Sequence, residues 1–160
     1  MRRIVALTLV GAIAGALACA PRIRPAANGP SVEAEVLAFL ESWNRTLSGR
    51  DTSAIASFYV ADSALRWYED GALRYSSRNE VLAALAAFPP NTGVATDLNR
   101  INVVVITADR VHIKASFRTQ IRMPTDSFAF AGVFTALLHR GPSGWHFVTG
   151  HTSTVRANSR

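Results

Sequence analysis

The stretch RVHIKASFRTQIRM, residues 110–123, carries the clearest structural pattern in the chain. Every second position is apolar except for one threonine, in the set Val111, Ile113, Ala115, Phe117, Thr119, Ile121 and Met123. The positions between them hold only polar residues: Arg110, His112, Lys114, Ser116, Arg118, Gln120 and Arg122. A period of two is typical of a strand with one buried face and one solvated face. The stretch therefore predicts a sheet that is covered on one side only.

Further strand-like segments flank this stretch, at residues 98–106, 128–139 and 145–154. Turn residues separate the segments at 107–109, at 124–126 and at Gly141-Pro142-Ser143-Gly144. Because such short connections join antiparallel neighbours, we expect the last four strands to form an antiparallel sheet.

Upstream of these strands, the sequence predicts a long first helix. Ser31 is placed to cap it, and Glu33 and Glu35 lie in its first turn, where the helix dipole favours acids. Apolar residues then recur at helical spacing: Val32, Val36, Phe39, Leu40, Trp43 and Leu47. Gly49 is expected to end the helix.

Two short helices and a hairpin follow. Asp51 is placed to cap the second helix, and Asp70-Gly71 is a strong two-residue turn signal between strands at 65–69 and 72–75. This turn would place Tyr68 opposite Leu73 and Trp67 opposite Arg74, which leaves open which face turns inward. Finally, Ser77 and Glu80 form a capping box for a third helix, which Pro89-Pro90 stops.

The N-terminus has the pattern of a secretion signal. Arg2 and Arg3 precede an apolar run at 4–17, and Ala16-Leu17-Ala18 leads to Cys19, the only cysteine. The run is shorter than the roughly 20 residues of a membrane-spanning helix. Cys19 resembles the lipidated cysteine of a bacterial lipobox, which implies that it becomes the mature N-terminus. Residues 16–18 also form a good A-x-A site, so ordinary signal cleavage is an alternative, and an uncleaved anchor is another.

We therefore divide the chain into a signal peptide (1–18), a lipidated Cys19 with a flexible tether (19–30), one folded domain (31–155) and a tail (156–160). Ala20, not Asp, follows the cysteine. By resemblance to Gram-negative lipoproteins, this implies the periplasmic face of the outer membrane, and a secreted or soluble periplasmic protein is the alternative. The formal net charge of +6 is weak evidence for nucleic acid, and export argues further against such a partner.

Two local segments add to the predicted element order. Residues LSGRD at 47–51 lead to FYVAD at 58–62, and GVF at 132–134 is followed by GWHFVTGHTS at 144–153. With the order α-α-β-β-α-β-β-β-β, they resemble the nuclear transport factor 2-like superfamily, in particular its SnoaL-like and ketosteroid-isomerase-like members. The resemblance implies an α+β fold in which a curved antiparallel sheet wraps the long N-terminal helix as a cone around a pocket. The superfamily contains enzymes and binding modules, so this fold does not give the function.

The sequence gives little indication of an acid–base enzyme. Isomerases of this group use a carboxylate base, and the resemblance carries its position to about Trp67, whose indole cannot abstract a proton. Glu69 lies beside the Asp70-Gly71 turn and is expected in water. The other acids cap helices, lie in turns or face outward, except Asp97, which has no evident structural role. No Cys or His cluster has metal-ligand spacing, so neither a metal nor a cofactor is expected.

The predicted pocket lining is mostly aromatic: Trp43, Tyr59, Trp67, Phe117, Thr119, Phe147 and His151, with Tyr75 as a further candidate. Aromatic side chains at such positions are more often part of a filled core than of a ligand-binding surface. In a regular strand His151 shares a face with Trp145, Phe147 and Thr149, which predicts the concave side, and His146 faces the other way. His151 would orient a ligand or shuttle a proton there, or it hydrogen-bonds a carbonyl at the sheet edge. The remaining candidates for catalysis are His151, Tyr59 and Asp97.

Three functions stay open at this point. The leading hypothesis is a secreted, lipid-anchored domain that binds a small hydrophobic molecule in an internal pocket. The rival is a small-molecule isomerase, cyclase or hydrolase that uses His151 with Tyr59 or Asp97. The third is an interaction module that forms a homodimer through its sheet. The basic stripe of Arg110, Lys114, Arg118 and Arg122 is then a solvated surface or a contact with a partner subunit, an acidic macromolecule or anionic lipid.

Overall fold

The computed structural model describes residues 30–61 and 64–155. The predicted signal peptide (1–18), Cys19, nearly all of the tether and the tail (156–160) lie outside the described residues. The elements follow the predicted order: α1 (Val32–Gly49), α2 (Thr52–Ala56), β1 (Arg66–Glu69), β2 (Ala72–Tyr75), α3 (Arg78–Ala86), β3 (Gly93–Thr107), β4 (Arg110–Arg122), β5 (Ser127–Gly141) and β6 (Gly144–Thr154). The fold is α+β, as expected.

Side-chain caps begin each described helix at the predicted residue. Ser31, Asp51 and Ser77 accept hydrogen bonds from the backbone N–H groups of Ala34, Ala54 and Glu80, at 3.1, 3.0 and 3.3 Å. Helix α1 ends at Gly49, as expected, and Arg50 takes the left-handed conformation after it, with φ of 56°. One detail differs from the expectation. The Glu80 carboxylate reaches back to the backbone N–H of Ser76, at 2.6 Å, instead of Ser77.

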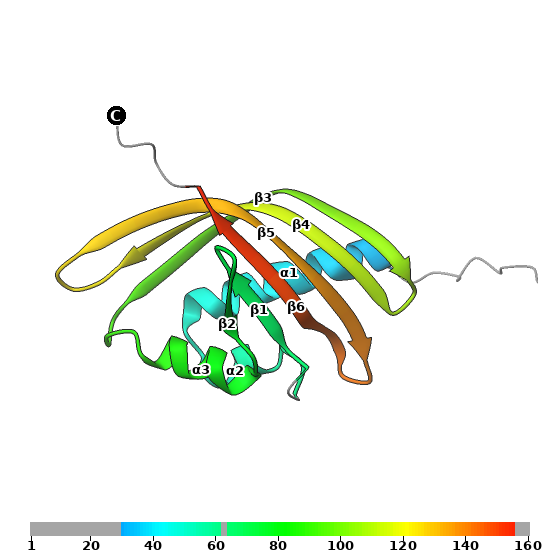
Figure 1. Ribbon diagram of the computed structural model, residues 1–160, viewed down its shortest axis with the longest axis horizontal. Coiled ribbons are helices and arrows are strands. Elements are labelled where there is room, and N and C mark those ends of the chain that lie inside the picture. Colours follow the sequence, from blue (N-terminus) through cyan, green and yellow to red (C-terminus); the bar gives the residue numbers. More distant parts are fainter. Residues whose placement is uncertain (1–29, 62–63, 156–160) are drawn as a thin grey trace, which may run out of the picture.

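The strands form one six-stranded sheet in the order β2-β1-β6-β5-β4-β3. Figure 1 shows the long strands β3–β6 arching over α1, with α2 and α3 on the open side of the arch. Neighbouring strands are antiparallel except β1 and β6, which pair in parallel. Strand β3 starts at Gly93, earlier than expected, because it pairs with β4 as far as Arg122. The inward face of β4 is the predicted one, from Val111 to Ile121.

Two bulges decide which side chains face inward. Between β1 and β2, Trp67 pairs with Tyr75 and Tyr68 with Leu73, so Arg74 is the extra residue. The predicted pairing of Trp67 with Arg74 is therefore wrong. Between β5 and β6, Leu137 pairs with Thr149 and Leu138 with Phe147, so Val148 is the extra residue. An extra residue inverts the alternation of the side chains that follow it.

The core lies between α1 and the concave face of the sheet, and Phe147 is at its centre with no exposed surface. Its ring centroid lies 5.1–5.7 Å from those of the surrounding aromatic side chains, Phe39, Trp43, Tyr59 and Trp67. Such tilted and edge-to-face contacts are the preferred geometry of aromatic pairs. None of the helices among the described residues is both long enough and apolar enough to cross a membrane.

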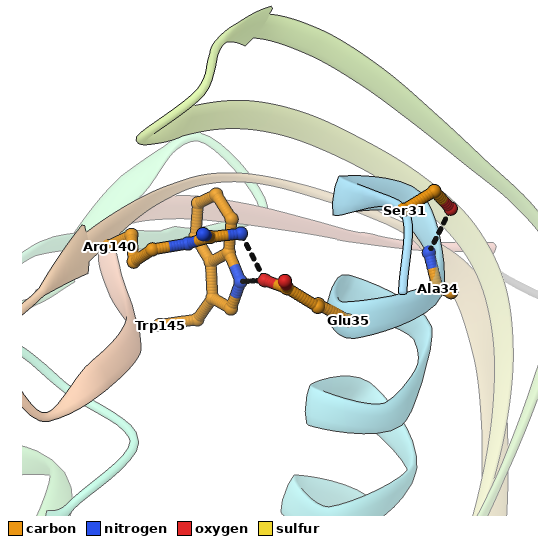
Figure 2. A network of polar contacts seen from close by, with 5 residues as sticks. All are labelled: Ser31, Ala34, Glu35, Arg140 and Trp145. Atoms are coloured by element: carbon orange, nitrogen blue, oxygen red, sulfur yellow. Dashed lines mark hydrogen bonds and ion pairs between the residues drawn. The ribbon is translucent and has the colours of Figure 1, made fainter. Parts of the chain in front are cut away.

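A polar contact fixes the start of α1 to the hairpin between β5 and β6 (Figure 2). The Glu35 carboxylate pairs with the Arg140 guanidinium and accepts a hydrogen bond of 3.2 Å from Trp145 Nε1. The guanidinium carbon of Arg140 lies 4.6 Å from the centre of the Trp145 ring, within cation–π range. These contacts fix the first turn of α1 against one end of the curved sheet.

Candidate ligand cavity

A cavity of about 230 Å³ lies between the concave face of the sheet and the helices. Side chains from α1, α3 and all six strands line it, most of them apolar. They are Trp43, Leu47, Tyr59, Trp67, Glu69, Tyr75, Val81, Leu85, Phe88, Val94, Thr96, Leu98, Phe117, Thr119, Ile121, Phe130, Phe134 and Thr152. Curvature of the sheet holds its inward side chains away from the helices, so the concave face is not filled completely.

The aromatic walls hold one another in place. Trp43 Nε1 on α1 donates a hydrogen bond of 3.2 Å to the Tyr59 hydroxyl, and both residues are buried. The rings of Trp67 and Phe134 stack at 6.5 Å with an interplanar angle of 22°. Burial raises the pKa of Tyr59 to about 12, against the effect of the hydrogen bond from Trp43, so the phenol is neutral at physiological pH. The walls are thus rigid, uncharged surfaces.

Among the described residues, Glu69 is the only carboxylate that lines the cavity. Its side chain is 42% exposed, so it lies where the cavity meets solvent. Burial raises the pKa of Glu69, the nearby Arg74 lowers it and Asp70 raises it again. Arg74 Nε lies 3.5 Å from Glu69 Oε2 on the exposed side. Burial and the charge of Glu69 together raise the pKa of the neighbouring Tyr75.

The remaining polar groups of the cavity are hydroxyls. Thr96 Oγ1 and Thr119 Oγ1, on the paired strands β3 and β4, lie 2.9 Å apart and hydrogen-bond to each other. Thr152 enters from β6. Since the two threonines satisfy each other, the floor of the cavity offers a ligand little polar binding energy. The polar end of the site is the region of Glu69 and Tyr75.

Five of the residues predicted for the pocket line this cavity: Trp43, Tyr59, Trp67, Phe117 and Thr119. Tyr75, the further candidate, also does. Phe147 does not; it lies behind the cavity wall, packed on all sides by other aromatic rings. Phe147 instead contacts the rings of Trp43 and Trp67, at 5.3 and 5.7 Å, and these two rings line the cavity.

His151 lies on the convex side of the sheet, so the expectation that it shares the concave face with Phe147 is wrong. The bulge at Val148 is the reason. Trp145 and Phe147 face inward, but after the extra residue the inward positions are Gly150 and Thr152. His151 instead pairs with Thr135 and with Tyr68 on the outer face. The same shift places His146 and His151 on one side, contrary to the regular-strand prediction.

Asp97 is also outside the cavity. It is exposed on β3, opposite Arg118 on the polar face of the sheet. Of the three candidates for catalysis, only Tyr59 therefore lines the cavity. Because neither His151 nor Asp97 lines the cavity, the predicted pairing of His151 with Tyr59 or Asp97 for catalysis is not formed there.

Glu69 is the functional candidate that sequence reasoning missed. Trp67 and Glu69 are two residues apart on β1, so they share a face. Because Trp67 faces inward, the side chain of Glu69 must also face the cavity. The missing information was the face of β1, which its parallel pairing with β6 fixes, while the bulge at Arg74 brings Tyr75 of β2 to the same face. Neither feature leaves a local mark in the sequence.

A metal site is not apparent in the described part of the chain. Residues 30–61 and 64–155 contain no group of three or more His, Cys, Asp or Glu side chains arranged to hold a metal ion. The chemistry that the cavity can support on its own is the binding of an apolar molecule, with a carboxylate of raised pKa at one end to accept a hydrogen bond or a proton.

Comparison with protein-family models matches residues 36–157 to the SnoaL-like domain. The protein belongs to the SnoaL-like domain family. A comparison of this SnoaL-like protein with curated protein sequences gives no match. The fold of the described residues agrees with the family, including the curved sheet and the long first helix.

Solved structures with the same fold include several of named or suspected enzymes. A putative dehydratase of the NTF2-like family from Streptomyces avermitilis is 21% identical, with a TM-score of 0.67 over 79% of this chain and 96% of its own. A putative scytalone dehydratase from Novosphingobium aromaticivorans is 11% identical, with a TM-score of 0.67 over 76% and 83%.

Another similar structure is described as an association domain. It is a putative calcium/calmodulin-dependent protein kinase II association domain from Xanthomonas campestris, 17% identical, with a TM-score of 0.66 over 81% of this chain and 91% of its own. At such low identities these likenesses establish the SnoaL-like protein's fold and nothing finer.

Proposed function

We propose that this SnoaL-like protein is exported, anchored to the membrane by a lipid on Cys19, and binds a small, largely apolar molecule in its cavity. The observation that carries the binding function is the cavity itself, with walls of Trp43, Tyr59, Trp67 and Phe117 and few polar groups. Concave, mostly apolar sites with a few placed polar groups are the usual form of small-molecule sites.

The volume limits the ligand. An engineered apolar cavity of roughly 150 Å³ binds benzene, and sites for drug-sized ligands measure roughly 300–1,000 Å³. The cavity of about 230 Å³ lies between these values. A single ring with a short chain, or a branched aliphatic molecule of that size, fits it best.

A matched pair of variants on β4 tests the binding function. Thr119→Phe places a ring inside the cavity, whereas Gln120→Phe places the same ring on the opposite face of the strand. Thermal shift and native mass spectrometry with a library of one-ring metabolites should show ligands for the wild type and for Gln120→Phe, and none for Thr119→Phe. Equal binding by the two variants would place the ligand elsewhere and would refute the proposal.

An enzyme is the second candidate, and Glu69 is the observation that favours it. A carboxylate held half-buried with a raised pKa can take a proton from a bound substrate. Two of the similar structures are described as putative dehydratases. Mass spectrometry of ligands after incubation separates the two candidates. Turnover that Glu69→Gln abolishes supports an enzyme, and ligands recovered unchanged support a binding protein.

The lipid anchor is tested independently of the cavity. Cells fed an alkyne-bearing palmitate should label the wild-type protein and leave Cys19→Ser unlabelled. Fractionation should then find the labelled protein in the outer membrane and the variant in the periplasm. Labelling of Cys19→Ser, or a soluble unlabelled wild type, would contradict the anchor and leave the binding function unaffected.

A homodimer through the sheet is a further proposal, and the outer face of β5 favours it. This face carries the small or apolar residues Ala129, Ala131 and Val133, and Val133 is 37% exposed. The basic side chains of β4 restrict the geometry, because two copies that met through this strand would bring like charges together. Sedimentation of the wild type and Val133→Asp tests the contact. A dimer that the substitution dissociates supports it, and a wild-type monomer at high concentration refutes it.

A further inference from the structure

The charge on the lining of the cavity is negative. In the part of the chain that the structure describes, Glu69 is the only charged side chain lining the cavity, and no Lys, Arg or His lines it. An anionic ligand would therefore meet a carboxylate with no compensating cation inside the cavity. A neutral apolar ligand would leave the partly buried carboxylate without a new partner and would add to its desolvation.

The rings beside Glu69 have the same electrostatic preference. Tyr59, Trp67 and Tyr75 line the cavity with it. Burial and, to a smaller extent, the charge of Glu69 raise the pKa of both tyrosines. The face of an aromatic ring carries negative potential, so these walls attract a cation. The Glu69 carboxylate and the aromatic rings therefore both favour a cationic group.

The protein already holds one cation at this place from the solvent side. The guanidinium carbon of Arg74 lies 5.6 Å from the centre of the Tyr75 ring, while Arg74 Nε lies 3.5 Å from Glu69 Oε2. The side chain of Arg74 is 61% exposed and does not line the cavity. Glu69 and Tyr75 thus make a cation-binding pair, occupied on the outer side and open toward the cavity.

We propose that the natural ligand is a small organic amine, with its apolar body in the aromatic cavity and its cationic nitrogen between Glu69 and the rings of Trp67 and Tyr75. This inference rests on the proposed binding function and adds to it the chemical class of the ligand. An ammonium group at this position satisfies the carboxylate through a charge-assisted hydrogen bond and also gains cation–π attraction.

The test compares three probes with nearly the same body: phenethylamine, phenethyl alcohol and phenylacetate. Calorimetry on the purified mature protein at neutral pH should give the tightest binding for the amine and none for the carboxylate. Glu69→Gln should weaken amine binding about 10- to 100-fold, the usual contribution of a hydrogen bond to a charged group, and should change alcohol binding little. Arg74→Gln should strengthen amine binding because the guanidinium no longer shares the carboxylate.

Glu41→Gln is the matched control, since Glu41 is exposed on α1 and pairs only with Arg45 among the described residues. It should leave all three affinities unchanged. Equal affinity for amine and alcohol, or an amine preference that survives Glu69→Gln, would overturn the ligand class and leave the binding function standing. If none of the three probes binds and a wider library of one-ring compounds also fails, both the function and this inference are wrong.

Discussion

The indole of Trp67 lies directly on the backbone of Gly150, its neighbour in the parallel pair of β1 and β6. A Cβ atom at residue 150 would be 2.3 Å from Cζ3 of Trp67 and 2.5 Å from Cε3. No side chain other than hydrogen fits there unless the ring moves. Because Trp67 forms a wall of the cavity, this contact links the parallel junction of the sheet to the shape of the site.

Gly150→Ala should destabilise the protein by about 1–3 kcal/mol, the typical cost of overpacking a core. Gly49→Ala is the control, because a Cβ at residue 49 meets nothing within 4 Å. Alanine in a helix is favoured over glycine by up to about 1 kcal/mol, so this variant should be neutral or more stable. Urea unfolding midpoints measure both. A Gly150→Ala variant as stable as the wild type would mean that the indole does not occupy this position.

Glu35→Ala should lower the unfolding free energy by about 2 kcal/mol, because it removes the partner of the Arg140 guanidinium and of the Trp145 indole. Glu33→Ala controls for the helix dipole, since Glu33 lies in the same first turn and is exposed. It should cost well under 1 kcal/mol. Thermal unfolding measures both variants. Equal losses of stability would mean that Glu35 acts only through its charge near the helix dipole.

Stability should fall as the pH rises from about 10 to about 12, because of Tyr59. Its pKa is about 12 in the folded protein, against 10.0 for an ordinary tyrosine. Between these values the unfolded chain loses the phenolic proton first, so unfolding becomes more favourable, by up to about 3 kcal/mol. Below pH 10 the contribution is fully present.

Tyr59→Phe should remove this part of the pH dependence. At neutral pH it should also cost about 1–3 kcal/mol, because the buried Trp43 N–H loses its acceptor. Chemical denaturation at a series of pH values measures both effects. An unchanged slope above pH 10 in the variant would show that another group is responsible.

Asp70→Ala should destabilise the protein by about 1–2 kcal/mol. The Asp70 carboxylate accepts hydrogen bonds of 2.7 Å from the backbone N–H and the hydroxyl of Thr154, and its φ of 49° is unfavourable for alanine. Asp70→Asn tolerates this backbone conformation and keeps one acceptor, so it should lose less than half as much. Equal losses in the two variants, measured by urea unfolding, would contradict this ranking.

Local patterns predicted much of the fold because the responsible interactions are local. The three N-caps act over three residues, and the alternation of β4 reflects a single buried face. Three of the cavity residues were found for a similar reason: Trp43 lies in the helical apolar repeat of α1, and Phe117 and Thr119 share the inward face of β4. Such features need no knowledge of the partner strand.

The order of the elements, their caps and the apolar concave face follow from local residue patterns. The inward position of Glu69 and the convex position of His151 arise only in the folded sheet. His151 is on the convex side because the bulge at Val148 inverts the side-chain alternation of β6, whereas Glu69 faces inward with Trp67 on β1, which pairs in parallel with β6. Register and bulges depend on how a strand fits its neighbours in the packed sheet, and the residue pattern of the strand alone does not specify that fit.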